Sequence, residues 1–540
     1  MTSFMNAAPI TVAVSFLHLL SPCVANKEEL KEKSASWRNI MLLALLFICL
    51  ILTYFIRVGQ KNAGRNSCLG VLTFIPESIV SLGIGCLTGL ALLLFDRPLL
   101  DLVAFDGSVF FVYLLPPIIF ESGYSLKKKA FFRNFVSIIV FAVVGTVIST
   151  VIVAFFCYIA GLLFSPYVYP LPLLDSFIFG ALISAVDPVA TLAIFNSLPI
   201  DEDLYSLVFG ESVLNDAVAV VLFRTLQSLR PVREETVNIV VGGNGSDVGT
   251  LEIEAQSSYH ASESQSVGLA IANFFLISFG SIAIGCILAL FSSLLLKMVK
   301  LKDHPSLELP VVLILSYFAY LIAEGLGLSG IMAILANGII TSHYTTAHLS
   351  RVGRLSIDNL THSLAVASET TVFAILGVSL FSTAHHVEVG FLVVATASIL
   401  AGRAANVFPL SYCLNSRRKK KITKPFRIML WFSGLRGAIA FALAISDTGD
   451  EKALLVTTTF SIVIGSVIIF GGGTRPLVSY LNLSTASPGN DDFELEEQYA
   501  PGSFERFDEA FLAPIFGPES DVQPFEPLHE KASDADEEDL

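Results

Sequence analysis

The sequence SAVDPVA at residues 184–190 lies in the middle of an apolar segment that is long enough to cross a membrane. Proline lacks a backbone N–H and disfavours helical geometry in the residue before it, so a helix through this segment should break or kink at Asp187. A second interruption, SGLRGA at 433–438, places two glycines around Arg436. Two broken helices, each carrying a charge at the break, set the architecture that we expect.

The segments around these breaks are unusually apolar. Apolar residues make up 54% of the 540 residues and charged residues 15%, against about 25% charged in soluble proteins. The mean hydropathy is +0.70. These values exclude a water-soluble globular enzyme and predict an all-α polytopic membrane protein. We count thirteen candidate transmembrane helices, near residues 41–57, 73–95, 107–123, 133–164, 175–197, 206–227, 268–297, 309–325, 328–342, 360–382, 389–413, 426–446 and 453–480.

The two breaks occupy matching places in this series. Spans one to six and eight to thirteen would form inverted six-helix repeats, with span seven as the linker. The break in span five then corresponds to the break in span twelve. Discontinuous helices at matching positions of two halves indicate a transporter site where those helices cross. The alternative is a pair of packing kinks without a function.

The two ends of the chain differ from this transmembrane domain, which we assign to residues 39–482. Residues 1–25 are expected to be a signal peptide, because a short apolar run ends there in CVA. No Lys or Arg precedes that run, so an uncleaved interfacial or membrane segment is the alternative. Residues 483–540 form an acidic tail. From residue 491 onward the tail holds 17 Asp and Glu against Arg506 and Lys531, a net charge of −15, which leaves about +1 for the rest.

The tail has two interpretations. A segment with this charge and few apolar residues is typically solvated and disordered. The other interpretation is a docking segment for a cytosolic partner, because aromatic residues are interleaved with the acids. These residues are Phe493, Phe504, Phe507, Phe511, Phe516 and Phe525.

Sidedness follows from Lys and Arg in short loops, which gather on the cytosolic side. Every second loop is basic: those near 57–65, 127–133, 297–302, 351–354 and 417–427. The N-terminus is therefore expected outside or in a lumen, and the tail in the cytosol. The polar loop 229–266 falls on the non-cytosolic side, where Asn244 begins a glycosylation sequon. One loop on the basic side, DED at 201–203, carries no cation.

Ionisable side chains inside apolar spans are costly, and each is a candidate for function. The eight candidates are Glu121, Asp187, Glu211, Asp216, Glu324, Glu369, Arg403 and Arg436.

Span six carries two of these carboxylates, in the sequence FGESVLNDA at 209–217. On a helix, Glu211 and Asn215 share a face, whereas Asp216 points about 140° away from Glu211 and stacks over Ser212. One carboxylate can therefore be paired structurally while the other faces a cavity. The partner of Glu211 should be a buried cation, either Arg403 or Arg436.

Five runs of the chain resemble the signature segments of the eukaryotic sodium/proton exchangers, in the order of that family and over residues 40–480. They are LLPPIIFESGY at 114–124, ISAVDPVAT at 183–191, FGESVLNDA at 209–217, LSGIMA at 328–333 and GLRGAIA at 434–440. The phrases SHY at 342–344 and NVFPLS at 406–411 are most similar to the Golgi and endosomal branch.

The resemblance implies a homodimeric antiporter in a lipid bilayer, in Golgi or endosomal membranes, with the plasma membrane as the alternative. It implies no cofactor, and we expect no nucleic-acid partner. It also implies roles for individual residues. Asp216 is the ion carrier, the Asn215–Asp216 pair marks an electroneutral member, and Glu211 pairs with Arg403. Asp187 and Arg436 are the charges of the crossing helices, and Phe120, Glu121 and Gly123 belong to a region that affects inhibitor sensitivity.

Exchange would follow from competition at one carboxylate. A carboxylate can be neutralised by one H⁺ or one Na⁺, and moving it bare past an apolar barrier is disfavoured, so only the loaded forms should alternate access. If Asp216 alone titrates and Asp187 stays ionised, no net charge moves. Asn215 and the opened backbone near Asp187 would supply neutral oxygens to the cation.

Three other functions compete with this one. A K⁺-preferring antiporter would use the same residues, and a cation channel would need no titratable carrier. An intramembrane aspartyl protease also uses two membrane aspartates, but it needs a Tyr-Asp and a Gly-x-Gly-Asp context. Here the two aspartates lie in Val-Asp-Pro and Asn-Asp.

Overall fold

The computed structural model describes residues 27–62, 77–95, 97–103, 105–187, 191–192, 195, 198, 200–230, 267–299, 301–382, 386–418, 420–483 and 513–516. Within these ranges the chain is helical and contains no β-strand. The expected signal peptide 1–25, Asn244 and the tail apart from Leu483 and 513–516 lie outside the described residues.

The first half of the chain alternates long helices with short connections. Its elements are α2 (Lys27–Asn62), α3 (Glu77–Phe95), α4 (Arg97–Val103), α5 (Gly107–Val109), η2 (Phe110–Leu114), α6 (Leu115–Tyr124), α7 (Lys128–Ile139), η3 (Val140–Val144), α8 (Gly145–Leu163), α9 (Leu173–Ser184) and α11 (Glu202–Gln227).

The second half has the same character. It contains α12 (Val267–Val299), η4 (Leu301–Asp303), α13 (Pro305–Gly325), α14 (Gly330–His343), η5 (Thr345–His348), α15 (Arg351–Ser379), α16 (Val389–Asn415), α17 (Lys424–Phe432), α18 (Ala438–Ser446), α19 (Lys452–Ser466), η6 (Val467–Gly471), α20 (Gly472–Tyr480) and α23 (Ala513–Phe516).

All thirteen expected segments contain helix. Among the described residues, ten helical stretches are long and apolar enough to cross a membrane. Three of them, 107–124, 128–163 and 452–480, run on through a π-helical turn, which inserts one residue without ending the helix. The remaining segments are the short apolar helices α9 and α14 and the broken pair α17–α18. The chain is thus an all-helical, multi-pass membrane protein, and the count of thirteen crossings stays a prediction.

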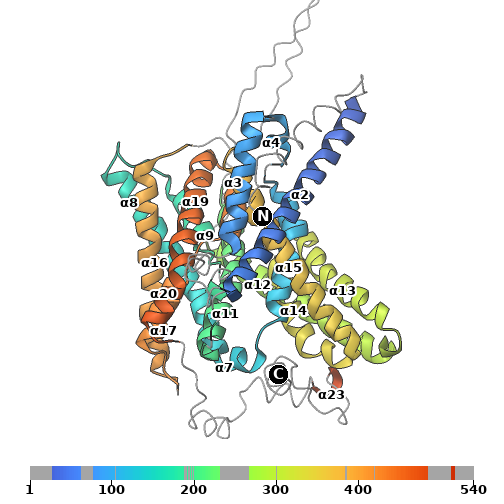
Figure 1. Cartoon of the computed structure of the whole chain (residues 1–540). Helices are drawn as coiled ribbons and strands as arrows, with labels where there is room; N and C mark the ends of the chain where they lie inside the picture. Colours follow the sequence, from blue (N-terminus) through green and yellow to red (C-terminus); the bar gives the residue numbers. More distant parts are fainter. Residues whose placement is uncertain are drawn as a thin grey trace, which may run out of the picture.

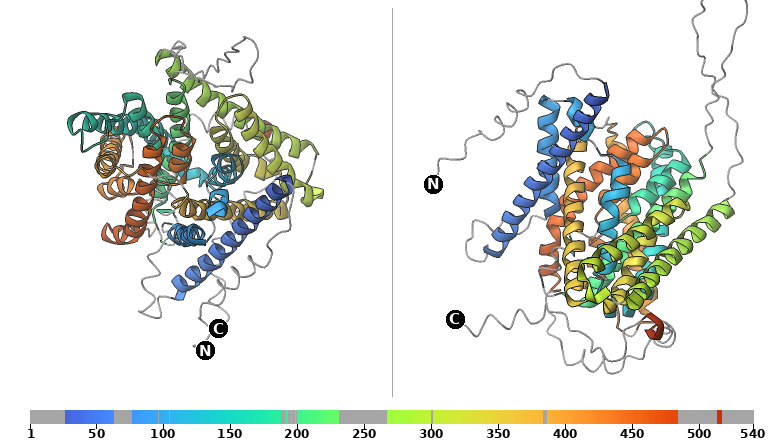
Figure 2. Two further views of the ribbon diagram at one scale, coloured as in Figure 1. Left: turned by 90° about the horizontal axis from the view of Figure 1, so that it is seen from above. Right: turned by 90° about the vertical axis from the view of Figure 1, so that its right-hand side faces the viewer.

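The helices form two bundles. The first bundle contains α7–α9, α11 and α16–α20, which pack on one another, and the second contains α2, α3, α6 and α12–α15. Figure 1 shows α8, α16 and α19 on one side and α13–α15 on the other, and the view from above in Figure 2 shows the same separation. The bundles meet along α11, which contacts α12, α14 and α6.

The two predicted interruptions cross in the first bundle. Helix α9 ends at Ser184, and its partner breaks between α17 and α18. The backbone amide of Asp187 donates to the carbonyl of Leu435, 3.0 Å away. A Cβ atom on Gly437 would lie 2.0 Å from Asp187 Oδ2, so only glycine permits this approach. The crossing of interrupted helices that the sequence predicts is therefore present.

Candidate functional site

Helix α11 presents the expected acids beside this crossing. It packs against α9 and also contacts α18. The exposed fraction of Glu211 is 0%, that of Asn215 is 1% and that of Asp216 is 6%. Three polar side chains are thus buried on one helix at membrane depth, where each has to be compensated.

Glu211 is compensated by an arginine. Arg403, on α16, binds both carboxylate oxygens, one through Nη1 and the other through Nη2 at 3.1 Å. Nη2 also donates to the carbonyl of Leu430 at 2.7 Å, near the end of α17. Both side chains of the pair are nearly fully buried. Of the two cations that the sequence offered to Glu211, the structure places Arg403 against it.

Arg436 takes a different position, inside the break between α17 and α18. Its backbone amide donates to Ser466 Oγ at 3.1 Å, and Ser466 lies at the end of α19. The residue is 2% exposed. Its guanidinium Nη1 donates to the carbonyl of Gly434 at 3.5 Å. Asp216 and Arg436 interact electrostatically. Arg436 therefore brings a buried positive charge to the crossing, without a direct salt bridge to Asp216 among the described residues.

Asp216 faces the opened end of α9. Its carboxylate accepts a hydrogen bond from the backbone amide of Val186 and interacts electrostatically with Asp187 and Arg436. Within the described part of the chain, no salt bridge reaches Asp216. Its situation is the opposite of that of Glu211, although only five residues of one helix separate them.

Asn215, the residue before Asp216 on α11, adds a neutral oxygen. Its side-chain Oδ1 is buried and has no hydrogen-bond partner among the described residues. A buried amide oxygen without a donor is uncommon, because it loses its contact with water. Carboxylate and amide oxygens are ligands that hard cations prefer. Asp216 and Asn215 therefore fit a transported monovalent cation as substrate.

The residues of the expected inhibitor region lie on α6, in the second bundle. Phe120 stacks on Tyr124, with ring centroids 5.8 Å apart. Glu121 contacts His362 Nδ1 at 3.4 Å. A Cβ atom on Gly123 would meet the carbonyl of Leu335 at 2.8 Å, so this glycine allows α6 and α14 to pack closely. None of these contacts joins the region directly to Asp216.

Glu369 is a carboxylate that is coupled electrostatically to both of these groups. It sits on α15 and interacts electrostatically with both Asp187 and Glu121. The sequence identified it as an ionisable residue inside a span but gave it no role. Its position relative to the two bundles depends on tertiary packing, which no local pattern in the sequence encodes.

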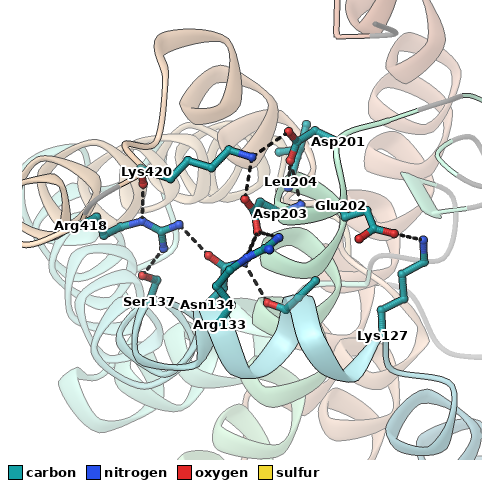
Figure 3. Close-up of polar contacts among 11 residues, drawn as sticks. Lys127, Arg133, Asn134, Ser137, Asp201, Glu202, Asp203, Leu204, Arg418 and Lys420 are labelled. Carbon is teal, nitrogen blue, oxygen red and sulfur yellow. Dashed lines mark hydrogen bonds and ion pairs between the residues drawn. The ribbon is translucent and has the colours of Figure 1, made fainter. Parts of the chain in front are cut away.

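A polar network fixes one end of α11 within the first bundle (Figure 3). Asp201 caps the helix by accepting from the amide of Asp203 at 2.8 Å. The carboxylate of Asp203 binds Arg133 Nη2 at 2.6 Å and Lys420 Nζ at 2.9 Å. Burial lowers the pKa of Lys420, but the carboxylates of Asp203 and Asp201 outweigh it and the net pKa is raised. The acidic loop 201–203 contains no cation of its own, and its carboxylates pair with cations from the basic stretches near 127–133 and 417–427. The loop therefore lies at the same end of the molecule as those two stretches.

A second network fixes the opposite end of α11. Arg230 binds Asp447 Oδ1 at 2.6 Å and also pairs with Asp175. Gln227 Nε2 donates to the same oxygen of Asp447 at 3.0 Å. Burial lowers the pKa of Arg230, but these carboxylates raise it more strongly. Because both networks lie inside the first bundle, that bundle is tied together at its two ends.

Among the described residues, fewer polar contacts join the two bundles than join the helices of the first bundle to one another. Arg224 on α11 binds Glu324 on α13 at 3.1 Å, with both side chains about one third exposed. Near the other end, Lys128 of α7 donates to the carbonyl of Ser342 on α14. The seam between the bundles is thus held more loosely than the interior of the first bundle.

Known proteins of one family are similar to this chain over most of its length. Residues 63–480 match the family model described as sodium/hydrogen exchanger, transmembrane. The chain is 40% identical to sodium/hydrogen exchanger 8 of Homo sapiens over 463 residues, 84% of this chain and 73% of that protein. It is 41% identical to sodium/hydrogen exchanger 9 of Rattus norvegicus over 394 residues, 71% of this chain and 57% of that protein. A solved structure of the sodium proton antiporter MjNhaP1 from Methanocaldococcus jannaschii matches 83% of this chain and all of that one, with a TM-score of 0.58 and 17% identity, and shares the fold.

Proposed function

Because this chain belongs to the sodium/hydrogen exchanger family, we propose that it exchanges Na⁺ for H⁺ through Asp216, with Asn215 as a neutral ligand of the cation. It is a secondary transporter rather than an enzyme. The ions are its substrates, and exchange calls for no cofactor.

One observation carries the role of Asp216. Three buried carboxylates share α11. Arg133 and Lys420 neutralise Asp203 and Arg403 neutralises Glu211, while no salt bridge reaches Asp216 in the described chain. An unpaired carboxylate away from water is unstable when bare, so it is stabilised by a bound proton or a bound cation. These two ligands compete for one site. Competition at a single site is what couples the movement of one ion to the movement of the other.

The remaining charges of the crossing support electroneutral exchange. Asp187 lies in the opened backbone of α9 and Arg436 in the break before α18, so the crossing holds one charge of each sign besides Asp216. If both stay ionised, they add no net charge to the moving site. Loading Asp216 with H⁺ in one direction and Na⁺ in the other then transfers no charge.

The surroundings of the transporter belong to the same proposal. We assign it to Golgi or endosomal membranes, as a homodimer, with the acidic tail in the cytosol. This assignment is supported by the resemblance of SHY at 342–344 and NVFPLS at 406–411 to that branch, and by the alternation of basic loops. Its work would be to adjust the pH and cation content of a lumen.

The test is proton movement in proteoliposomes that contain a pH-sensitive dye. Na⁺ or K⁺ is added to the wild type and to Asp216→Asn, with the membrane potential free or clamped. Asparagine keeps the size of the side chain but cannot carry a proton or neutralise a cation. We expect cation-driven proton movement that ignores the potential and is lost in Asp216→Asn, while the variant keeps its fold and its oligomeric state.

Each other outcome has a distinct meaning. Normal exchange by Asp216→Asn would exclude Asp216 as the carrier. Movement that depends on the potential would bring Asp187 into the transported charge. A larger response to K⁺ than to Na⁺ would make the protein a K⁺-preferring antiporter, and uncoupled current would favour a channel.

A further inference from the structure

The tail segment α23 binds the transmembrane domain through its backbone. Lys297 Nζ donates to the carbonyl of Ile515 at 2.9 Å. The carbonyl of Phe516 accepts from Ser293 Oγ at 3.1 Å and lies 2.8 Å from His348 Nε2. Since a carbonyl only accepts, Nε2 of His348 carries the hydrogen in this contact. Three donors from α12 and η5 thus satisfy the last carbonyls of a short helix, which have no partners within the helix.

One side chain of the segment adds a specific contact. The ring of Phe516 lies edge-on to the ring of Tyr344, with centroids 6.3 Å apart, and Phe516 is partly buried. The neighbouring Ile515 side chain is 54% exposed. Recognition therefore combines backbone carbonyls with a single aromatic ring. We call Ser293, Lys297, Tyr344 and His348 the tail seat.

The tail seat adjoins the seam between the two bundles. Tyr344 packs against His343 with ring centroids 4.6 Å apart, and His343 packs against Phe132 of α7 at 6.3 Å. A row of rings therefore leads from Phe516 in the tail to α7 in the first bundle. Figure 1 shows α23 at the same end of the molecule as α7 and α17.

Charge also favours this pairing. The tail has a net charge of −15 from residue 491 onward, while the stretch 297–302 that begins with the seat residue Lys297 contains three lysines and no acid. Opposite charges of this kind attract the tail to this face and raise its local concentration there.

We propose that the tail seat is a binding site for the protein's own residues 513–516 and that the docked tail slows exchange. This inference rests on the proposed function, because it assigns a regulator to that transport cycle. We expect the segment to dock best in one of the relative positions that the two bundles adopt during transport. If α7 moves relative to α14 during the transport cycle, the Phe132–His343 contact has to change, and with it the packing of Tyr344 that receives Phe516. A ligand that binds one state better shifts the equilibrium towards that state and delays departure from it.

Docking is tested separately from transport, in the full-length protein in lipid nanodiscs. A photoreactive benzoylphenylalanine replaces Phe516, and the cross-linked peptides are identified by mass spectrometry. We expect cross-links to α12 and η5. They should weaken when the donors are removed together by Lys297→Met and His348→Phe. Cross-links to other segments, or none, would overturn the tail seat.

Regulation is tested with two tail variants that leave the transmembrane domain intact. Phe516→Ala removes the ring, whereas Ile515→Ala removes an exposed side chain whose carbonyl still accepts. Loss of the ring should lower occupancy of the seat about tenfold. We expect faster Na⁺-driven proton movement in Phe516→Ala and the wild-type rate in Ile515→Ala.

Equal rates in the wild type and both variants would overturn the regulatory role. A wild type that cross-links at the seat but moves no protons would instead contradict the proposed function and leave the docking site standing. The two failures are therefore distinguishable.

Discussion

The backbone amide of Asp187 donates a hydrogen bond to the backbone carbonyl of Leu435, so the two interrupted helices touch through their main chains. The amide of the preceding residue, Val186, donates to the carboxylate of Asp216. The crossing point and the proposed carrier thus share one three-residue stretch of opened backbone. Any change that separates α9 from α18 should therefore disturb Asp216 as well.

Gly437→Ala tests this dependence. The new Cβ atom would lie 2.0 Å from Asp187 Oδ2 and 2.3 Å from Asp187 Cβ, and Asp187 or the break has to move. We expect exchange to be lost and the free energy of unfolding to fall by about 1–3 kcal/mol, as for other overpacked sites. The matched control is Gly465→Ala on α19, where nothing lies within 4 Å of the added atom. Wild-type exchange in Gly437→Ala would show that the crossing tolerates separation.

Glu211→Gln should destabilise the protein rather than alter its ion selectivity. The substitution leaves Arg403 buried at 3% exposure without its anion. Breaking a buried pair by removing one partner costs about 3–5 kcal/mol. The measurement is the amount of folded protein after detergent extraction and its melting temperature. Adding Arg403→Met removes the stranded charge and should restore part of the stability, and wild-type abundance of Glu211→Gln alone would argue against a structural pair.

Arg230→Met should loosen the end of α11 that lies far from the tail seat. Asp447, whose side chain is fully buried, then keeps only Gln227 as a side-chain donor among the described residues. Because one buried charge loses its counter-ion, we expect a loss of about 3 kcal/mol and a lower melting temperature. Lys127→Met is the control, since Lys127 and Glu202 are both more than half exposed, and such pairs contribute about 1 kcal/mol or less. Equal melting temperatures for the two variants would contradict the role of the Arg230 network.

Asn244→Gln tests the sidedness of the transporter. If loop 229–266 faces a lumen, Asn244 receives a glycan, and glycosidase treatment should increase the gel mobility of the wild type but not of Asn244→Gln. The sequons at Asn359 and Asn482 are expected on the cytosolic side. Replacing either one should therefore leave the mobility unchanged. A glycan at Asn482 would reverse the proposed orientation.

The breaks in α9 and α17–α18 could be predicted from the sequence because proline and glycine act on the backbone where they stand. Pro188 placed the break at Asp187, and the helix ends slightly earlier, at Ser184. The glycines around Arg436 likewise lie between the end of α17 and the start of α18. Local backbone chemistry was enough to locate the two interrupted helices.

The partners of the charges were less accessible to sequence reasoning. From the residue types alone, Arg403 and Arg436 were equivalent candidates for Glu211, since the choice depends on how α16 packs against α11. Only the family resemblance singled out Arg403, which the structure places against Glu211. The loop 201–203 seemed to contradict the charge pattern because its cations, Arg133 and Lys420, belong to other loops. The seat for Phe516 could not be found either, although that residue was among the interleaved aromatics of the tail. Contacts between distant segments have no signature in the spacing of residues.

Helix α11 differs from α12 in how many of its positions face other helices. In the most apolar window of each helix, 89% of α11 is buried inside the molecule but only 17% of α12. A buried position rejects both a larger side chain and a smaller one, whereas a lipid-facing position accepts most apolar residues of any size. We therefore expect few substitutions to be tolerated along 202–227. Most of the chain's freedom to diverge would lie in the helices that line the outside of the second bundle, so related transporters can adapt to membranes of different composition without touching the ion pathway.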